Sequence, residues 1–175
     1  MAVLGVDDFK AKLRGGGARP NLFKVTVNYP AVAGGDAELT SFMCEAAQLP
    51  GSTIGVIPIP FRGRQLKVAG DRTFAPWTTT IINDTDFAVR NSMERWMNSI
   101  NAHSANTGVT SPIVYESDII VEQLDRDGSS LKKYTLRGAF PSDLSPIELS
   151  YADQDTIERF SVAFEYQYYD TDTVS

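Results

Sequence analysis

The strongest pattern along this chain is a period-two alternation of apolar and polar side chains. Every second residue is apolar from Phe23 to Tyr29, and again from Phe160 to Tyr168. Since successive side chains of a β-strand point to opposite faces, each stretch is expected to bury one face and expose the other. Related patterns predict further strands at residues 39–47, 77–82, 119–124, 134–140 and 147–151. In the strand predicted at residues 39–47, Phe42, Cys44 and Ala46 are expected to be buried on one face.

One stretch departs from this pattern and predicts a helix. Apolar residues from Val89 to Ile100 recur at helical spacing and form a single stripe. Thr85 is a candidate N-cap for this helix. The pair Asp127-Gly128 predicts a hairpin turn between two strands. Seven strands at short spacing and one packed helix predict a mainly β subunit, an antiparallel β-sandwich or barrel, with residues 1–175 forming a single domain.

Residues 49–74 combine features that rarely occur together. Pro58 and Pro60 each remove a backbone donor, which excludes a helix interior or a central strand. The stretch also carries five large apolar side chains within eight residues, from Ile54 to Phe61, and then a basic segment. Two interpretations remain: an extended arm that docks on another molecule, or a covered edge strand and hairpin within one domain. Composition alone favours the second.

The chain has 175 residues and a net charge of −6. The negative charge argues against a protein that binds nucleic acid through its phosphates. The charge is unevenly distributed: residues 50–75 carry four basic side chains and one acidic, whereas residues 143–175 carry eight acidic and one basic. Opposite charges of this kind allow copies of the chain to associate, although the residues alone favour ordinary solvated charge as the explanation. No apolar run is long enough for a membrane helix, and residues 1–5 do not resemble a secretory signal.

The sequence contains no recognisable catalytic or metal-binding motif. Gly15-Gly16-Gly17 is not followed by the lysine and hydroxyl residue of a phosphate loop. The single His103 and the single Cys44 have no partners at ligand spacing, and residues 125–128 lack the remaining ligands of a calcium loop. We therefore predict no enzyme, no cofactor and no metal. A pair of carboxylates distant in sequence remains open, though nothing points to one. A carbohydrate-binding module, with exposed Tyr166 and Tyr168 stacking on sugar, is an alternative function.

Several strings occur in an informative order. Residues 68–74 read VAGDRTF and are followed by WTTT at 77–80 and IND at 82–84. ARPNLF stands at 18–23, and four residues separate Cys44 from Leu49-Pro50. Over nearly the whole chain this arrangement resembles the tail tube protein of contractile-tailed (myovirus-type) bacteriophages. The tube proteins of type VI secretion and of phage-like bacteriocins are similar in fold to that family.

The resemblance implies an assembly. Six copies would close a ring whose inner sheets join into a larger closed barrel, and rings would stack into a tube through which phage DNA passes into the host without specific binding. Implied partners are the sheath protein, the baseplate and the tail terminator, with no membrane insertion; the protein would be assembled in the host cytoplasm and reside in the virion tail. A tube subunit of a headless contractile injection system remains an alternative.

Two arms are expected to reach neighbouring subunits. Residues 49–74 form an extended inter-subunit arm, and residues 1–20 form an amphipathic segment tethered by its three glycines, hence a flexible N-terminal arm. Residues 170–175 are expected to be a loose acidic tail. The candidate inter-subunit contacts are Ile57, Ile59, Phe61, Arg62, Arg64, Lys67, Asp71 and Arg72 in the first arm and Phe9 and Leu13 in the second.

Overall fold

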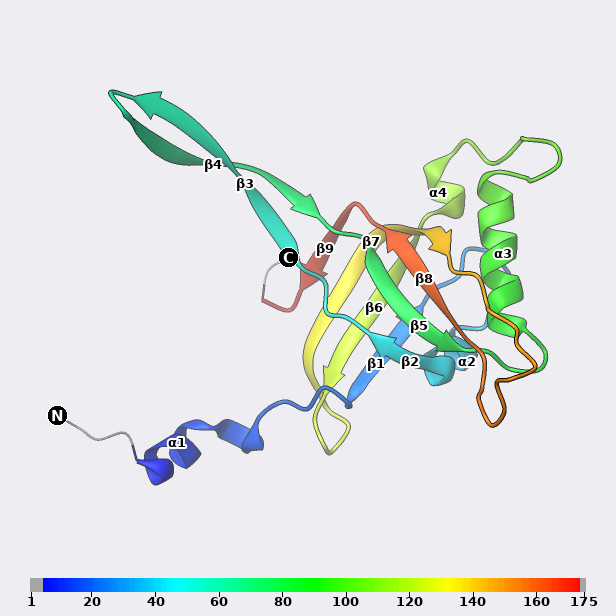
Figure 1. Ribbon diagram of the computed structural model, residues 1–175, viewed down its shortest axis with the longest axis horizontal. Coiled ribbons are helices and arrows are strands. Elements are labelled where there is room, and N and C mark those ends of the chain that lie inside the picture. The colour runs from blue at the N-terminus through cyan, green and yellow to red at the C-terminus, as the bar shows by residue number, and fades with distance from the viewer. Residues whose placement is uncertain (1–4, 174–175) are drawn as a thin grey trace.

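A computed structural model describes residues 5–173 and shows a large antiparallel sheet with one projecting hairpin (Figure 1). The sheet has the order β1-β6-β7-β8-β5-β2, with β9 also paired to β7. Its strands are β1 (Phe23–Val27), β2 (Cys44–Ala47), β5 (Trp77–Ile82), β6 (Ser117–Leu124), β7 (Ser130–Leu144), β8 (Arg159–Glu165) and β9 (Tyr168–Thr171). The hairpin consists of β3 (Ser52–Phe61) and β4 (Arg64–Phe74). The predicted mainly β, antiparallel class is confirmed.

Strand β7 changes partners near its middle, at Gly138. Residues 130–139 pair with β6, whereas Phe140 to Leu144 pair with β8. Gly138 has a φ of +62°, and a Cβ there would lie 2.9 Å from the side chain of Gln167 and 3.0 Å from that of Glu116. Only glycine fits both the backbone conformation and the space. The strand continues through Pro141, so the prediction that it ends before this proline was wrong.

The same point interrupts the last predicted strand, which divides into β8 and β9 around Gln167. The backbone N–H of Gln167 donates to the carbonyl of Arg137 at 2.9 Å, directly beside Gly138. The alternation was otherwise predicted correctly: Phe160, Val162 and Phe164 are buried. Tyr168 lies after the break and is exposed, so it does not continue the buried face.

The predicted helix is α3 (Ala88–Ile100), which packs on the sheet through its apolar stripe. Trp96 is fully buried, its ring contacts Tyr29 and Phe164, and its Nε1–H donates to the carbonyl of Tyr115 at 2.7 Å. The predicted cap was wrong. Asp84, not Thr85, accepts a hydrogen bond from a free N–H of the first turn, that of Ala88 at 3.2 Å.

Residues 37–43 form helix α2 (Ala37–Met43), where a strand was predicted. The side chain of Asp36 accepts hydrogen bonds from the N–H groups of Glu38 and Leu39, which are two of the donors left free at a helix start. As a result Phe42 lies on the solvent side with 78% of its surface exposed. In β2, Cys44 is only half-buried and Ala46 is exposed, so the predicted buried face does not form.

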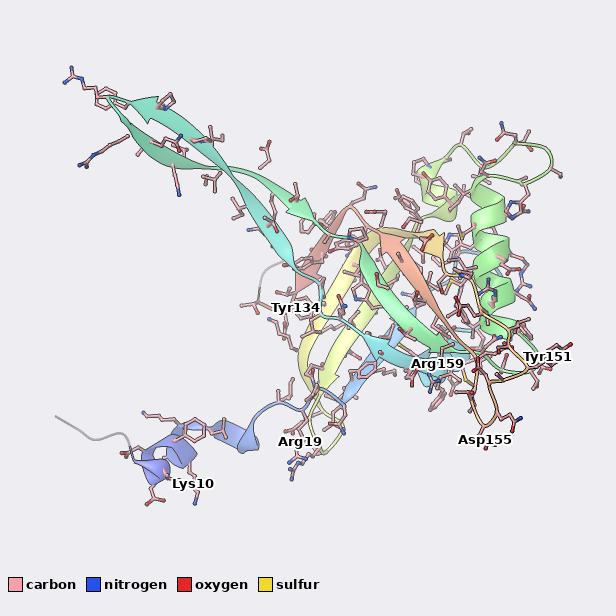
Figure 2. The ribbon with its side chains drawn as sticks, in the orientation of Figure 1. Lys10, Arg19, Tyr134, Tyr151, Asp155 and Arg159 are labelled. Atoms are coloured by element: carbon pink, nitrogen blue, oxygen red, sulfur yellow. The ribbon has the colours of Figure 1, made fainter. Side chains whose placement is uncertain are left out.

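The strand predicted at residues 147–151 is also absent. This segment belongs to the loop between β7 and β8, and Leu149 and Tyr151 are both exposed. Figure 2 shows Tyr151 and Asp155 on the outer part of this loop. Two further helices complete the described chain, α1 (Val6–Lys12) near the N-terminus, followed by the short 3-10 turn Arg14–Gly16, and α4 (Pro112–Tyr115) before β6.

Candidate functional site

The hairpin β3-β4 stands out from the body as a separate two-stranded ribbon (Figure 1). Its strands are joined by Arg62 and Gly63, whose φ angles are +43° and +80°. A two-residue loop with both φ angles positive has the type I′ form, whose twist matches that of the paired strands. Every residue of β3 is exposed. The covered edge strand that composition favoured is therefore wrong, and the extended arm is what the structure contains.

One face of the hairpin is continuously apolar. The register pairs Ile57 with Val68 and Ile59 with Leu66, and Phe61 follows two residues further along the same face. These side chains are between 42% and 66% exposed. A contiguous apolar surface of this kind is uncommon on a monomer and indicates an interaction site. Leu66 and Val68 were missed as candidates, although their period-two spacing in the sequence could have identified them.

The basic residues are arranged around this face. Arg62 lies at the tip, with its guanidinium 5.4 Å from the centre of the Phe61 ring, and Arg64 pairs directly with Phe61. Lys67 pairs with Pro58, so its side chain lies on the opposite face of the ribbon. Asp71 and Arg72 lie nearer the root. Within residues 5–173, none of these five charged side chains forms an ion pair, so the hairpin presents an excess of uncompensated positive charge.

The root of the hairpin is held by aromatic residues of the C-terminal strands. Phe74, the last residue of β4, contacts Tyr166 and Tyr169 at centroid distances of 5.7 and 5.5 Å. The hydroxyl of Tyr169 donates to the Oγ of Ser52 at the start of β3, at 3.3 Å. Both ends of the hairpin therefore meet the same short segment of the body, which restrains the direction in which the hairpin points.

That segment is itself tied down by charge, and the predicted loose acidic tail was wrong for Asp170 and Asp172. Arg137 of β7 donates from Nε to Asp170 at 2.7 Å and from its other arm to Asp118, and these contacts raise the pKa of Arg137. Lys132 donates to Asp172 at 2.7 Å and lowers the pKa of that carboxyl. Residues 174–175 lie outside the described range.

The second predicted arm contains an amphipathic helix that touches little of the body. In α1, Phe9 and Val6 are largely exposed, and Leu13 follows just after the helix with 42% of its surface exposed. Gly15, Gly16 and Gly17 all have positive φ angles and connect the helix to the body. Figure 2 shows Lys10 on this segment, well separated from the sheet. Residues 1–4 of the predicted arm lie outside the described range.

The described residues show little that indicates a catalytic or ligand-binding site. Residues 5–173 contain no group of three or more His, Cys, Asp or Glu side chains placed to hold a metal ion. The pKa of the Cys44 thiol is raised by burial, which disfavours the reactive thiolate. Tyr166, proposed above as an exposed sugar-stacking residue, is only 8% exposed and lies under Phe74. Over the same residues no helix is long and apolar enough to cross a membrane.

The amino-acid sequence matches the family model described as "Phage tail tube protein" over residues 18–172. The chain belongs to the phage tail tube protein family. It is 33% identical over 166 residues to the tail tube protein of Serratia phage KSP90, covering 92% of this chain and 93% of that protein. It is also 33% identical over 169 residues to tail tube protein gp19 of Enterobacteria phage T4, covering 94% and 99% of the two chains.

Solved structures share the fold of this tail tube protein. The sheath/tube terminator of the extracellular contractile injection system PVC superposes with a TM-score of 0.66 at 16% identity, over 89% of this chain and 96% of that one. A chain of the PVC sheath-tube complex superposes with a TM-score of 0.61 at 14% identity, over 95% and 97%. Together with the sequence relationships, these findings make the chain a structural component of a virion tail tube.

Proposed function

We propose that this tail tube protein polymerises as stacked hexameric rings, and that its hairpin and N-terminal segment join neighbouring subunits. Residues 1–175 act in this proposal as a single tail-tube domain with two arms, residues 1–20 and 49–74. The observation that carries it is the apolar face of the hairpin, which projects beyond the body and has nothing to cover it within residues 5–173. Contact with another subunit removes this surface from water.

Five apolar side chains of this face would contribute to the proposed contact. Ile57, Ile59, Phe61, Leu66 and Val68 each retain a large exposed fraction. Because each side chain is already about half covered, burying the exposed remainder stabilises an association by about 0.6–2 kcal/mol per side chain, before the entropic cost of association is subtracted. A stack of rings is a head-to-tail contact, which does not close on itself and therefore extends into a filament.

The experiment compares two neighbouring residues of β4 whose side chains lie on opposite faces. Leu66→Ser removes an apolar side chain from the proposed contact face, and Gln65→Ser alters the other face at the adjacent position. Purified proteins are concentrated and the lengths and numbers of tubes are measured by negative-stain electron microscopy. Leu66→Ser is expected to shorten tubes or reduce their number at least tenfold, whereas Gln65→Ser leaves them unchanged. Equal tube formation by the two variants would show that assembly does not depend on the apolar face.

The N-terminal arm is tested separately by deleting residues 1–14. The exposed stripe of Val6, Phe9 and Leu13 is expected to order on a neighbouring subunit. Truncated protein should retain its thermal unfolding temperature, because α1 contributes no buried residue to the core. Tubes should nevertheless be fewer. Unchanged assembly after truncation excludes this role for the arm.

The further partners follow from the same assembly. A tube of this family is proposed to lie within a sheath, to start on a baseplate and to end at a terminator, and to carry DNA through its lumen without specific binding. Structural relatives from a sheath-tube complex, a terminator and a baseplate support these partner classes. The chain's net charge of −6 suits a passage along which phosphates slide without binding. No catalytic step is assigned to the protein.

A headless contractile injection device remains the second candidate. The PVC chains share the fold, but they are only 14% and 16% identical to this protein. The phage tail tube proteins are 33% identical over nearly their full length, which favours a phage tail. Identification of the genes adjacent to this one distinguishes the two, because capsid genes accompany only the phage.

A further inference from the structure

The two edges of the hairpin differ in their backbone chemistry. Phe61 and Arg64 close a two-residue loop, and such a closing pair is hydrogen-bonded across the strands. Hydrogen-bonded and non-hydrogen-bonded pairs alternate along an antiparallel ribbon. Pro60 and Pro58 therefore fall in non-hydrogen-bonded pairs, in which the backbone N and C=O of each residue point away from the partner strand. Their placement agrees with proline's lack of an N–H group, since neither is needed as a donor within the hairpin.

The outer edge of β3 consequently lacks donors at Pro58 and Pro60. Directly across the ribbon from these prolines, Lys67 and Gln65 of β4 direct both an N–H and a C=O outward. No other strand among residues 5–173 pairs with β4 on that side. The edge of β4 is therefore the one that offers a regular row of donors and acceptors, while the edge of β3 is blocked in its outer half.

We propose that the outer edge of β4 pairs with a strand of a second copy of this chain, which extends the hairpin to a three-stranded sheet at the subunit contact. This inference rests on the proposed function, because it specifies how the hairpin docks. An isolated two-stranded hairpin is marginally stable in water, and a third strand with an apolar face stabilises it. Main-chain hydrogen bonds supply affinity in such strand addition, and alternate side chains supply specificity.

The positive charge of the hairpin favours a second copy of this chain as the partner of β4. The hairpin carries Arg62, Arg64, Lys67 and Arg72 against Asp71, whereas the whole chain has a net charge of −6. The remainder of each copy is therefore more acidic than the chain as a whole. A second copy brings negative charge to the positive hairpin, so opposite charges meet when β4 approaches a neighbouring body.

Proline substitution tests the backbone contact directly. Lys67→Pro removes one outward N–H from β4 at the position opposite the natural Pro58, so the bonds between β3 and β4 are retained. Lys67→Ala is the matched control, because it removes the same side chain and keeps the N–H. We expect Lys67→Pro to form at least tenfold fewer tubes than Lys67→Ala, whose own difference from the wild type measures the contribution of the Lys67 side chain. Protection of the Leu66 and Val68 amides from hydrogen exchange verifies that the hairpin is intact.

A second proline variant tests the same backbone contact at another position, in case Lys67→Pro unfolds the hairpin locally. Gln65→Pro, opposite Pro60, removes a different outward N–H and is paired with Gln65→Ala. If either proline variant keeps its hairpin and assembles as its alanine control does, the edge pairing is overturned. If Leu66→Ser blocks assembly in the same assay, only the edge pairing fails and hairpin docking stands. If Leu66→Ser also assembles normally, the proposed function of the hairpin fails with it.

Discussion

The ring of Phe74 packs against that of Tyr169 in an edge-on arrangement, with 5.5 Å between centroids and 74° between planes. This contact joins the last residue of the projecting hairpin to the short C-terminal strand β9. Because the ring of Tyr134 also lies 5.8 Å from that of Tyr169, centroid to centroid, the contact extends into the sheet. The orientation of the hairpin therefore depends on residues nearly a hundred positions away in the chain.

Tyr169→Ala is expected to loosen the hairpin root. It removes ring contacts with Phe74 and Tyr134, each worth about 0.5–1.5 kcal/mol beyond burial, so the free energy of unfolding should fall by about 1–3 kcal/mol. Tyr169→Phe keeps both ring contacts and loses only the exposed hydrogen bond to Ser52. Chemical denaturation measures the free energy of unfolding of both variants. Limited proteolysis near residue 50 should accelerate for Tyr169→Ala alone; equal cleavage rates would contradict the role of the ring.

Tyr166→Phe is expected to stabilise the protein. The hydroxyl of Tyr166 is buried and has no hydrogen-bond partner within the described residues, and burial raises its pKa. A buried polar group without a partner costs about 1–3 kcal/mol, which phenylalanine avoids while keeping the ring against Phe74. Thermal unfolding should show a higher Tm than in the wild type. A lower Tm would indicate that the hydroxyl has a partner, such as a bound water molecule.

Charge reversal at the hairpin tip is expected to weaken assembly without unfolding the subunit. Arg62→Glu combined with Arg64→Glu reverses two exposed charges that have no ion-pair partners among residues 5–173. Tubes should become shorter at low salt, and the wild-type protein should lose length as salt screens the same attraction. Arg126→Glu, in the exposed β6-β7 turn, is the control for a single charge reversal away from the hairpin. Wild-type tube lengths in the double variant would refute an electrostatic role for the tip.

Acid is expected to release β9 from the sheet. The pKa of Asp172 is lowered mainly by the hydrogen bond from Lys132, below the ordinary value of 3.8. A carboxyl with a lowered folded pKa stabilises the fold above its unfolded pKa and loses that contribution as the pH falls through the folded value. Hydrogen-exchange protection of those β9 amides that bond to β7 should therefore decrease below about pH 4. Lys132→Met should show a smaller decrease over the same range, and an identical decrease would exclude this ion pair as the cause.

Gly138→Ala is expected to destabilise more than Gly34→Ala. Both glycines have φ angles near +60°, but a Cβ at Gly138 meets Gln167 and Glu116 within about 3 Å, while a Cβ at Gly34 meets no atom within 4 Å. Left-handed backbone alone costs a non-glycine residue about 1–2 kcal/mol. The difference between the two free energies of unfolding measures the cost of crowding where β7 changes partners. Equal losses would mean that the neighbouring side chains move aside freely.

The sequence predicted the elements whose pattern and tertiary environment agree. Phe160, Val162 and Phe164 alternate in the chain and are buried in the structure, and Trp96 lies on a helical stripe that packs on the sheet. The prediction failed where a local signal outweighed alternation. Asp36 caps a helix at residues 37–43, which period-two spacing alone had suggested was a strand. The segment at residues 147–151 alternates but finds no partner strand, so it remains a loop.

The candidate site was predicted in part. The sequence showed an apolar, proline-containing stretch with a basic end, but composition alone favoured a covered edge strand over an extended arm. The two faces of the hairpin depend on its register. That register is set by the turn at Arg62 and Gly63, which pairs Ile59 with Leu66 and places Lys67 on the other side. The clamp of Arg137 on Asp118 and Asp170 was not foreseen, because its members lie on three different strands.

Pro58 and Pro60 also affect how unassembled subunits can associate with one another. In a subunit that has not assembled the hairpin is uncovered, and a ribbon with two open edges can add further strands at both edges to form fibrils. Because the prolines close one edge over its outer half, hairpins can pair two by two but cannot continue the series. The edge of β4 thereby stays available to a neighbouring subunit, while unassembled subunits are kept from forming fibrils.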